Sequence, residues 1–118
     1  MIRERAGLDR ALDALEDLET ELMASGLSGS GRVFNLTWHD WLNLRSLIDT
    51  SRVIALAARQ RENSRGAHFR ADFPEPGELA QSTYTVARRK NGQVAVSEAP
   101  VQFTIVRPGE TLIKEAAE

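Results

Sequence analysis

Residues 61–74 read RENSRGAHFRADFP, and this stretch decides how the chain of 118 residues is organised. It separates a first half with helical periodicity from a second half rich in strand residues. Three arginines, one histidine and two carboxylates fall within it, together with a glycine and a closing proline. We therefore expect a functional connector between two structural parts rather than an ordinary loop.

The overall composition indicates one ordinary domain, residues 1–118, that needs no disulfides. Hydrophobic residues make up 42% and charged residues 27%, with a formal net charge of -2 and no cysteine. These values are close to the soluble globular average, and the small charge gives no reason to expect nucleic acid as a partner. No apolar run reaches the length that spans a bilayer, which predicts a cytoplasmic chain without direct membrane insertion.

The first helix is predicted from leucines that recur three or four positions apart, at Leu8, Leu12, Leu15, Leu18 and Leu22. Its other face is strongly acidic. That face could dock a basic partner, although a solvated surface is the simpler interpretation. Ser25 and Gly26 should end the helix, and the glycines between 26 and 31 should let the chain reverse direction.

A second, longer helix should begin at Trp38, with Thr37 as its N-cap, and continue to Gly66. This gives about 27 residues, or roughly 40 Å. Apolar residues cover more than one narrow stripe of it, which predicts a helix that runs antiparallel to the first and is buried on two sides. Part of the surface that buries it should come from outside this chain.

Arginines cluster where this second helix is expected to end. Arg59, Arg61 and Arg65 would occupy its last two turns, where cations complement the negative end of the helix dipole. Gly66 can adopt the left-handed conformation of a C-terminal cap. The dipole therefore accounts for these arginines but not for the residues that follow.

His68, Arg70 and Asp72 alternate along a segment that we expect to be extended, so their side chains should share one side. Such a group could bind an anion, orient a catalytic group of another surface, or form an ion-pair network that fastens two domains. A metal site is not indicated, because the spacing is not that of known ligands and arginines repel cations. Ser64 has no arrangement that would make it a nucleophile.

The last third of the chain predicts a small antiparallel sheet. Residues 82–89 and 93–97 have strand composition and flank Asn91-Gly92, a strong signal for a tight hairpin. Residues 98–100 should break the second strand, and Val101, Phe103 and Ile105 alternate as in a third strand. The fold class is thus α+β, two long antiparallel helices followed by a three-stranded antiparallel sheet. The basic residues 88–90 at the tip of the hairpin are expected only to keep the exposed turn soluble.

Residues 61–74 resemble the C-terminal region of the succinate dehydrogenase and fumarate reductase flavoprotein subunit family, which includes L-aspartate oxidase. Members of that family end a long helix with Arg-x-Glu-Ser-Arg-Gly-Ala-His, followed by x-Arg-x-Asp-aromatic-Pro. The matching residues here are Arg61, Ser64, Arg65, Gly66, Ala67, His68, Arg70, Asp72, Phe73 and Pro74. Asn63 replaces the usual glutamate, which puts an ion-pair role at that position in doubt, although Glu62 could substitute for it.

The resemblance extends over the helical part, residues 7–74, and is weaker over the strand part, residues 82–107. It implies a polypeptide with an FAD-binding domain, a capping domain over a dicarboxylate site, and this chain as the domain that packs against both. FAD would belong to the full-length protein, since this chain has no dinucleotide-binding fingerprint. An iron-sulfur subunit is a further partner that the resemblance implies.

The resemblance also implies which residues matter. We expect contacts with the FAD-binding or capping domain from Arg61, Ser64, Arg65, His68, Arg70 and Asp72, and we assign none of them as a catalytic acid or base. The whole protein would interconvert succinate and fumarate, and the isolated chain would be inactive. The alternatives are an L-aspartate oxidase domain and a free-standing interaction module.

Overall fold

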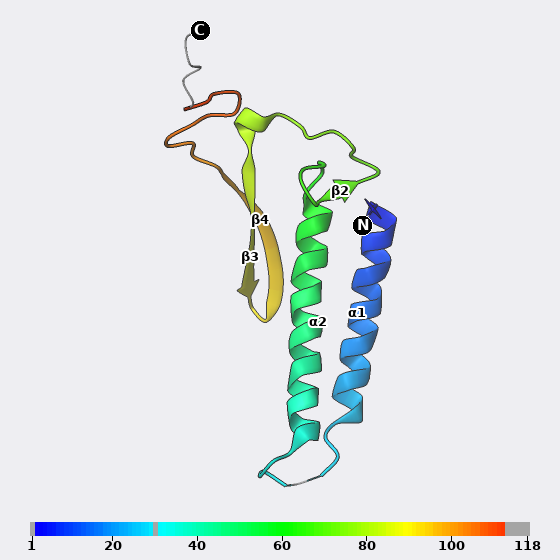
Figure 1. The fold of residues 1–118 in the computed structure, drawn as a ribbon. Coiled ribbons are helices and arrows are strands. Elements are labelled where there is room, and N and C mark those ends of the chain that lie inside the picture. Colours follow the sequence, from blue (N-terminus) through cyan, green and yellow to red (C-terminus); the bar gives the residue numbers. More distant parts are fainter. Residues whose placement is uncertain (1, 30, 113–118) are drawn as a thin grey trace.

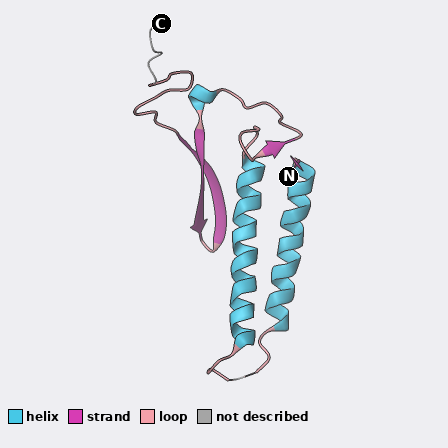
Figure 2. Ribbon diagram, viewed as in Figure 1, coloured by secondary structure: helices cyan, strands magenta, loops and turns pink. Residues whose placement is uncertain are grey.

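A computed structural model of the chain describes residues 2–29 and 31–112. Its two long helices are α1 (Arg5–Ser25) and α2 (Leu36–Gln60), which lie side by side and antiparallel (Figure 1). Two strands, β3 (Thr83–Lys90) and β4 (Gln93–Pro100), form a hairpin that lies along α2 on the side away from α1. The predicted α+β class, with two antiparallel helices and a hairpin, is confirmed, as the colouring of Figure 2 also shows.

Helix α1 begins and ends near the predicted positions. It starts three residues before Leu8, and Gly26 closes it with a φ of 60°, a backbone conformation that favours glycine. The hydroxyl of Ser25 donates to the carbonyl of Leu22 at 2.9 Å, which satisfies one of the free carbonyls of the last turn.

The predicted ends of α2 were wrong at both termini. Asn35, not Thr37, caps its start, because the Asn35 side chain accepts a hydrogen bond from the backbone N–H of Trp38 at 3.1 Å. The helix ends at Gln60 rather than Gly66, and Arg61 already has an extended backbone. Arg61 and Arg65 therefore do not lie in the last helical turns.

The helices hold together through a small core and three polar contacts. Arg52 pairs with Glu19 at 2.6 Å, Arg59 pairs with Asp9 at 3.0 Å, and the Trp41 indole donates to the carbonyl of Leu22 at 3.1 Å. The buried hydrophobic residues of the described chain are Leu22, Ile48, Ala55 and Ala58. This is a narrow core for two helices of such length.

The hairpin follows the turn chemistry of its sequence. Asn91 and Gly92 both have positive φ, 51° and 82°, as a two-residue turn between twisted antiparallel strands requires. Thr83 pairs with Pro100 at the open end, so residues 98–100 continue β4 instead of breaking it. Arg89 pairs with Asp49 of α2 at 3.2 Å and fixes the hairpin against the helix.

The predicted third strand is absent from the described residues. Residues 101–105 alternate in sequence but form no strand; the N–H of Val101 donates to the carbonyl of Ser82 at 2.9 Å, and the pairing goes no further. Alternation predicts a strand only where an edge is free to pair with it, and these residues leave the hairpin instead.

A second pairing, which the sequence did not indicate, closes the helical part. Strand β1 (Ile2–Arg3) runs parallel to β2 (Phe69–Arg70), with Ile2 opposite Phe69 and Arg3 opposite Arg70. The chain entering α1 is thereby joined to the chain that leaves α2. The predicted extended segment is thus reduced to two residues and a turn. Two of its polar side chains, those of Arg70 and Asp72, still meet directly.

Much apolar surface remains uncovered. The described residues have a radius of gyration of 20.5 Å, against about 13 Å for a compact domain of similar length. On α2 alone, large apolar side chains that are at least two-fifths exposed are Leu36, Trp38, Leu42, Leu44, Leu47 and Ile54. α2 contacts both α1 and the hairpin, as expected for a helix covered on two sides, yet these residues stay exposed.

Membrane spanning is a separate question. Within residues 2–29 and 31–112, neither long helix has the length and apolar character that a bilayer span requires.

Two isoleucines of α2, one buried and one exposed, test which face of the helix is packed. Ile48 is 4% exposed and Ile54 is 60% exposed. Ile48→Ala should lower the free energy of unfolding by about 3 kcal/mol because it leaves a cavity, and Ile54→Ala by about 0.5 kcal/mol. Urea denaturation of the chain, followed by circular dichroism, measures both. Equal losses would contradict the arrangement of the helix faces.

Candidate functional site

The site is built where α2 ends, on backbone carbonyls that have no partner within the helix. Arg70 supplies that partner. Its Nη1 donates to the carbonyls of Ala58, Arg59 and Arg61 at 3.0, 3.1 and 3.1 Å. Arg70 has no exposed surface, so this cation is buried against the negative end of the helix. We had predicted that Arg61 and Arg65 complement the dipole of this helix. In the structure, Arg70 does so.

Asp72 completes the arrangement from the other side. Its two carboxylate oxygens accept from Nε and Nη2 of Arg70 at 2.7 and 2.6 Å, the parallel fork of a strong guanidinium–carboxylate pair. The oxygen Oδ2 also accepts from the backbone N–H of Arg5 at 2.9 Å, in the first turn of α1. These bonds from Arg70 hold the pKa of Asp72 well below its ordinary value and raise that of Arg70.

We call the pair Arg70–Asp72, with the helix termini it contacts, the helix-end clasp. Because the helices are antiparallel, the positive end of α1 and the negative end of α2 lie at the same end of the molecule. The clasp places the carboxylate of Asp72 at the positive end of α1 and the guanidinium of Arg70 at the negative end of α2. Phe73 lies against the guanidinium of Arg70, with the ring centre 4.9 Å from the guanidinium carbon.

Ser64 fixes the backbone of the clasp. Its hydroxyl accepts from the backbone N–H of Arg70 at 2.8 Å and lies 2.8 Å from the carbonyl of Phe73, to which it donates. Its own N–H donates to the carbonyl of Glu75 at 2.9 Å. With its proton engaged in this way, Ser64 is a structural residue in this conformation.

Arg65 directs the chain from the clasp toward the hairpin. Arg65 and His68 exchange backbone hydrogen bonds of 2.9 and 3.1 Å across a tight turn in which Gly66 has a φ of 57°. The Arg65 side chain donates to the hydroxyl of Ser82 at 2.7 Å and to the carbonyl of Glu78 at 3.2 Å. It thus ties down the loop that leads into β3.

His68 and Arg61 lie beside the clasp. The Nε2 of His68 is 3.3 Å from the carbonyl of Arg61, so that nitrogen carries the proton. Burial lowers the pKa of His68, which favours the neutral imidazole. The Arg61 guanidinium donates to the amide oxygen of Asn63 at 3.3 Å, while Glu62 pairs with Arg5 at 3.5 Å and so does not take over a pairing with Arg61.

Sequence reasoning missed the contribution of the N-terminal residues. The N–H of Ala71 donates to the carbonyl of Arg3 at 2.8 Å, and the Arg3 guanidinium donates to the carbonyl of Ala67 at 3.2 Å. The signal that could have found them is the antiparallel pair of helices itself, which returns the end of α2 to the start of α1.

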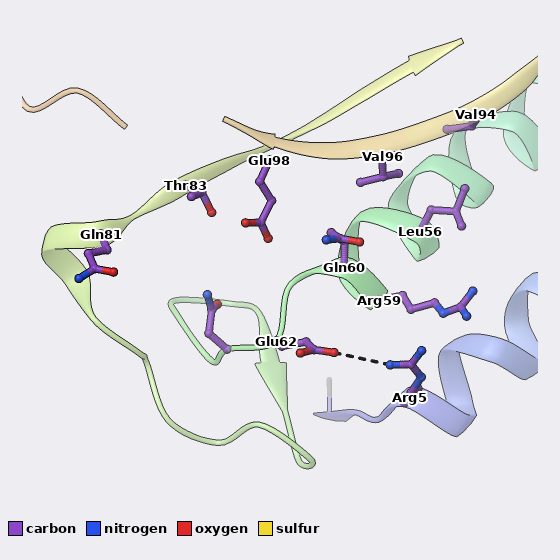
Figure 3. A pocket seen from close by; sticks show the side chains of 11 residues that line it. Arg5, Leu56, Arg59, Gln60, Glu62, Gln81, Thr83, Val94, Val96 and Glu98 are labelled. Atoms are coloured by element: carbon purple, nitrogen blue, oxygen red, sulfur yellow. Dashed lines mark ion pairs between the residues drawn. The ribbon is translucent and has the colours of Figure 1, made fainter. Parts of the chain in front are cut away.

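A polar pocket of about 660 Å³ opens between the clasp end of the helices and the hairpin (Figure 3). Arg5 and Glu62 pair with one another at 3.5 Å along one edge of it, and Glu98 and Thr83 project into it from the hairpin. The described residues contain no group of three side chains suited to hold a metal ion. The lining is mainly polar, and the ion pair of Arg5 and Glu62 forms part of it.

Comparison with known proteins defines the class. The family model described as "Fumarate reductase flavoprotein C-term" matches residues 1–113. The chain belongs to this family. It is the C-terminal domain of a flavoprotein subunit of the succinate dehydrogenase and fumarate reductase type.

Individual relatives agree with this assignment. The chain is 30% identical over 109 residues to the fumarate reductase flavoprotein subunit of Mycobacterium tuberculosis, covering 92% of this chain and 19% of that protein. It is 33% identical over 95 residues to the succinate dehydrogenase flavoprotein subunit of Coxiella burnetii, covering 80% and 16%. The chain thus spans less than a fifth of these relatives.

Solved structures share the fold. A chain of the Mycobacterium smegmatis Sdh1 complex in the apo form superposes with a TM-score of 0.73 at 34% identity, covering 91% of this chain and 18% of that one. Escherichia coli quinol fumarate reductase FrdA with the E245Q mutation gives a TM-score of 0.82 at 22% identity, covering 92% and 19%.

Replacing Arg70 should be among the most damaging single changes in the chain. Arg70→Ala leaves the last carbonyls of α2 and the carboxylate of Asp72 without their main partner, and should lower the free energy of unfolding by about 3 kcal/mol. Arg88→Ala, an exposed arginine of β3, is the matched control and should be close to neutral. Chemical denaturation of both variants measures the difference, and similar losses would refute the importance of the clasp.

The clasp should also weaken in acid. Because the pKa of Asp72 is lower in the folded chain than its ordinary value of 3.8, the unfolded chain takes up the proton first as the pH falls. The stabilisation is complete above that value and is lost as the pH falls through the folded pKa. Asp72→Asn should make the unfolding free energy less dependent on pH below about 4, whereas Asp17→Asn, at an exposed position of α1, should not.

Proposed function

We propose that this domain packs on the FAD-binding and capping domains of a flavoprotein that interconverts succinate and fumarate. The hydride passes between the dicarboxylate and FAD in those domains, and this chain contributes no catalytic acid or base. Its role is to brace them. The observation that carries the proposal is the surplus of uncovered apolar surface on a chain that matches less than a fifth of its relatives.

The apolar surface has a definite location. A groove of about 780 Å³ runs between α1 and α2, and its lining includes Leu8, Leu15, Leu18, Ile54 and Ala58. Leu18 is 48% and Ile54 60% exposed. Burial of apolar area at about 25 cal/mol per Å² would strongly favour docking of this face. The lining carries few charges, as the centre of a stable interface does.

Residues 61–74 divide between two roles in this proposal. Arg70, Asp72 and Ser64 shape the segment, because their polar groups are engaged within the chain. His68 and Arg61 lie at its surface and are the residues that would touch the FAD-binding or capping domain. Arg65 joins both roles, since it anchors the loop toward the hairpin. An iron-sulfur subunit is the next partner that a flavoprotein of this type would meet.

Complementation tests the proposal. The chain would be co-expressed with the remainder of the M. tuberculosis fumarate reductase flavoprotein subunit, and co-purification, flavin content and fumarate reduction would be measured. We expect the chain to co-purify and to restore activity. Arg65→Ala, His68→Ala and Ile54→Ala should each lower recovery of the complex at least about tenfold, by loss of about 1.4 kcal/mol of binding.

Arg88→Ala is the control, because it removes the same charge at a position away from both the apolar groove and residues 61–74. If the unmodified chain fails to co-purify, the docking proposal is wrong. If it binds but neither Arg65→Ala nor His68→Ala has an effect, the assignment of contact residues is wrong while the docking stands. Binding of an unrelated partner without any flavoprotein would favour a free-standing interaction module.

A further inference from the structure

The clasp end of the molecule carries arginines that form an ion pair and arginines that form none. Four pairs are made there: Glu4 with Arg10 at 3.9 Å, Asp9 with Arg59 at 3.0 Å, Glu62 with Arg5 at 3.5 Å, and Asp72 with Arg70 at 2.6 Å. Among the described residues, Arg3, Arg61 and Arg65 form no salt bridge. Each carboxylate of these pairs is already engaged with a different arginine.

The unpaired arginines are not free surface residues. Arg3, Arg61 and Arg65 are each only partly exposed, and each donates to neutral oxygens alone. Arg65 directs its donors into the loop before β3. Arg3 and Arg61 each make a single long side-chain bond, of 3.2 and 3.3 Å, and retain donors that these bonds do not use.

Arg3 and Arg61 flank His68 from two elements. Arg3 belongs to β1 and donates to the carbonyl of Ala67, the neighbour of His68, while Arg61 lies at the end of α2 and its carbonyl contacts the imidazole. The charged groups that act on His68 are Arg61, Arg3 and Arg70, all of them cations. Burial lowers the pKa of His68 most, and these guanidinium groups lower it further.

We propose that Arg3, Arg61 and His68 form a binding site for a carboxylate, and that its occupant is an aspartate or glutamate side chain from the part of the flavoprotein outside this chain. This inference rests on the proposed function, and it names the chemistry by which residues 61–74 recognise the domains they meet. The carboxylate would accept from the unused donors of the two arginines. The protonated Nδ1 of His68 could then donate to it as well.

A carboxylate fits this site better than a phosphate or a metal. Two guanidinium groups match the oxygens of a carboxylate, whereas phosphates are commonly cradled by successive backbone N–H groups or a helix N-terminus. The helix terminus that His68 contacts is the negative end of α2, and the N–H of Arg5 at the positive end of α1 already donates to Asp72. A cation is disfavoured by the arginines. The pair Arg70–Asp72 carries no net charge, so the positive charge of the site comes from Arg3 and Arg61. One acidic side chain would neutralise part of that positive charge.

The occupied site links docking to protonation. A carboxylate beside His68 favours the imidazolium, so its pKa should rise when the partner binds. Docking would then be accompanied by proton uptake at His68. Added salt should weaken the contact, because the site is partly exposed.

The probe for the test is the peptide acetyl-Glu-Glu-Glu-amide, added to the 118-residue chain at low ionic strength. The ring proton of His68 would be followed by NMR through a pH titration, with His39 as an internal reference on α2. We expect the peptide to raise the pKa of His68 by about one unit and to leave His39 unchanged. Arg3→Gln and Arg61→Gln should each remove most of this effect, whereas Arg88→Gln should not. Helicity by circular dichroism confirms that each variant is folded.

Other results would overturn the proposal. No change at His68 in a folded chain would do so, as would a larger effect of pyrophosphate, which would assign the site to the phosphates of a cofactor. A stronger effect of free succinate than of the peptide would make it a small-molecule site. In the co-expressed complex, Arg3→Gln with Arg61→Gln should also reduce the dependence of dissociation on salt. Intact complementation without these effects removes this inference and leaves the proposed function standing.

Discussion

The buried pair Arg70–Asp72 is the interaction on which the rest of the structure depends. One cation closes the carbonyl end of α2, and one anion accepts from the first turn of α1, so a single pair neutralises the facing ends of two helix dipoles. Burying an unpaired guanidinium would be strongly unfavourable, but here its donors have partners. The pair caps the end of α2 and joins it to the start of α1.

This arrangement explains in physical terms the motif of residues 61–74. Ser64 holds the backbone on which Arg70 stands, and Gly66 supplies the left-handed turn that brings His68 back beside Arg61. Such a shape requires several residues at once, because each bond orients the next. The same end of the molecule presents Arg3 and Arg61, so the contact role proposed for them would lie beside the structural role of Arg70.

Local chemistry made part of this fold predictable. The hairpin could be predicted because Asn91 and Gly92 determine their turn by themselves, and the helices because their leucines recur at helical spacing. The end of α2 could not, since the group that caps it, Arg70, lies ten residues beyond Gln60 and acts through the tertiary fold. The contacts of Arg3 and Arg5 with residues 67–72 lie more than sixty positions apart, and only the folded chain brings them together.

The short parallel pairing of β1 with β2 has a mechanical meaning. Parallel strands loaded from the start of one and the end of the other resist in shear, with all their hydrogen bonds sharing the load. A pull between Ile2 and the loop after Asp72 would therefore run across β1 and β2 and bypass the 56 residues from Arg5 to Gln60. The two helices lie outside this path, so such a load would pass through the clasp without stretching either helix.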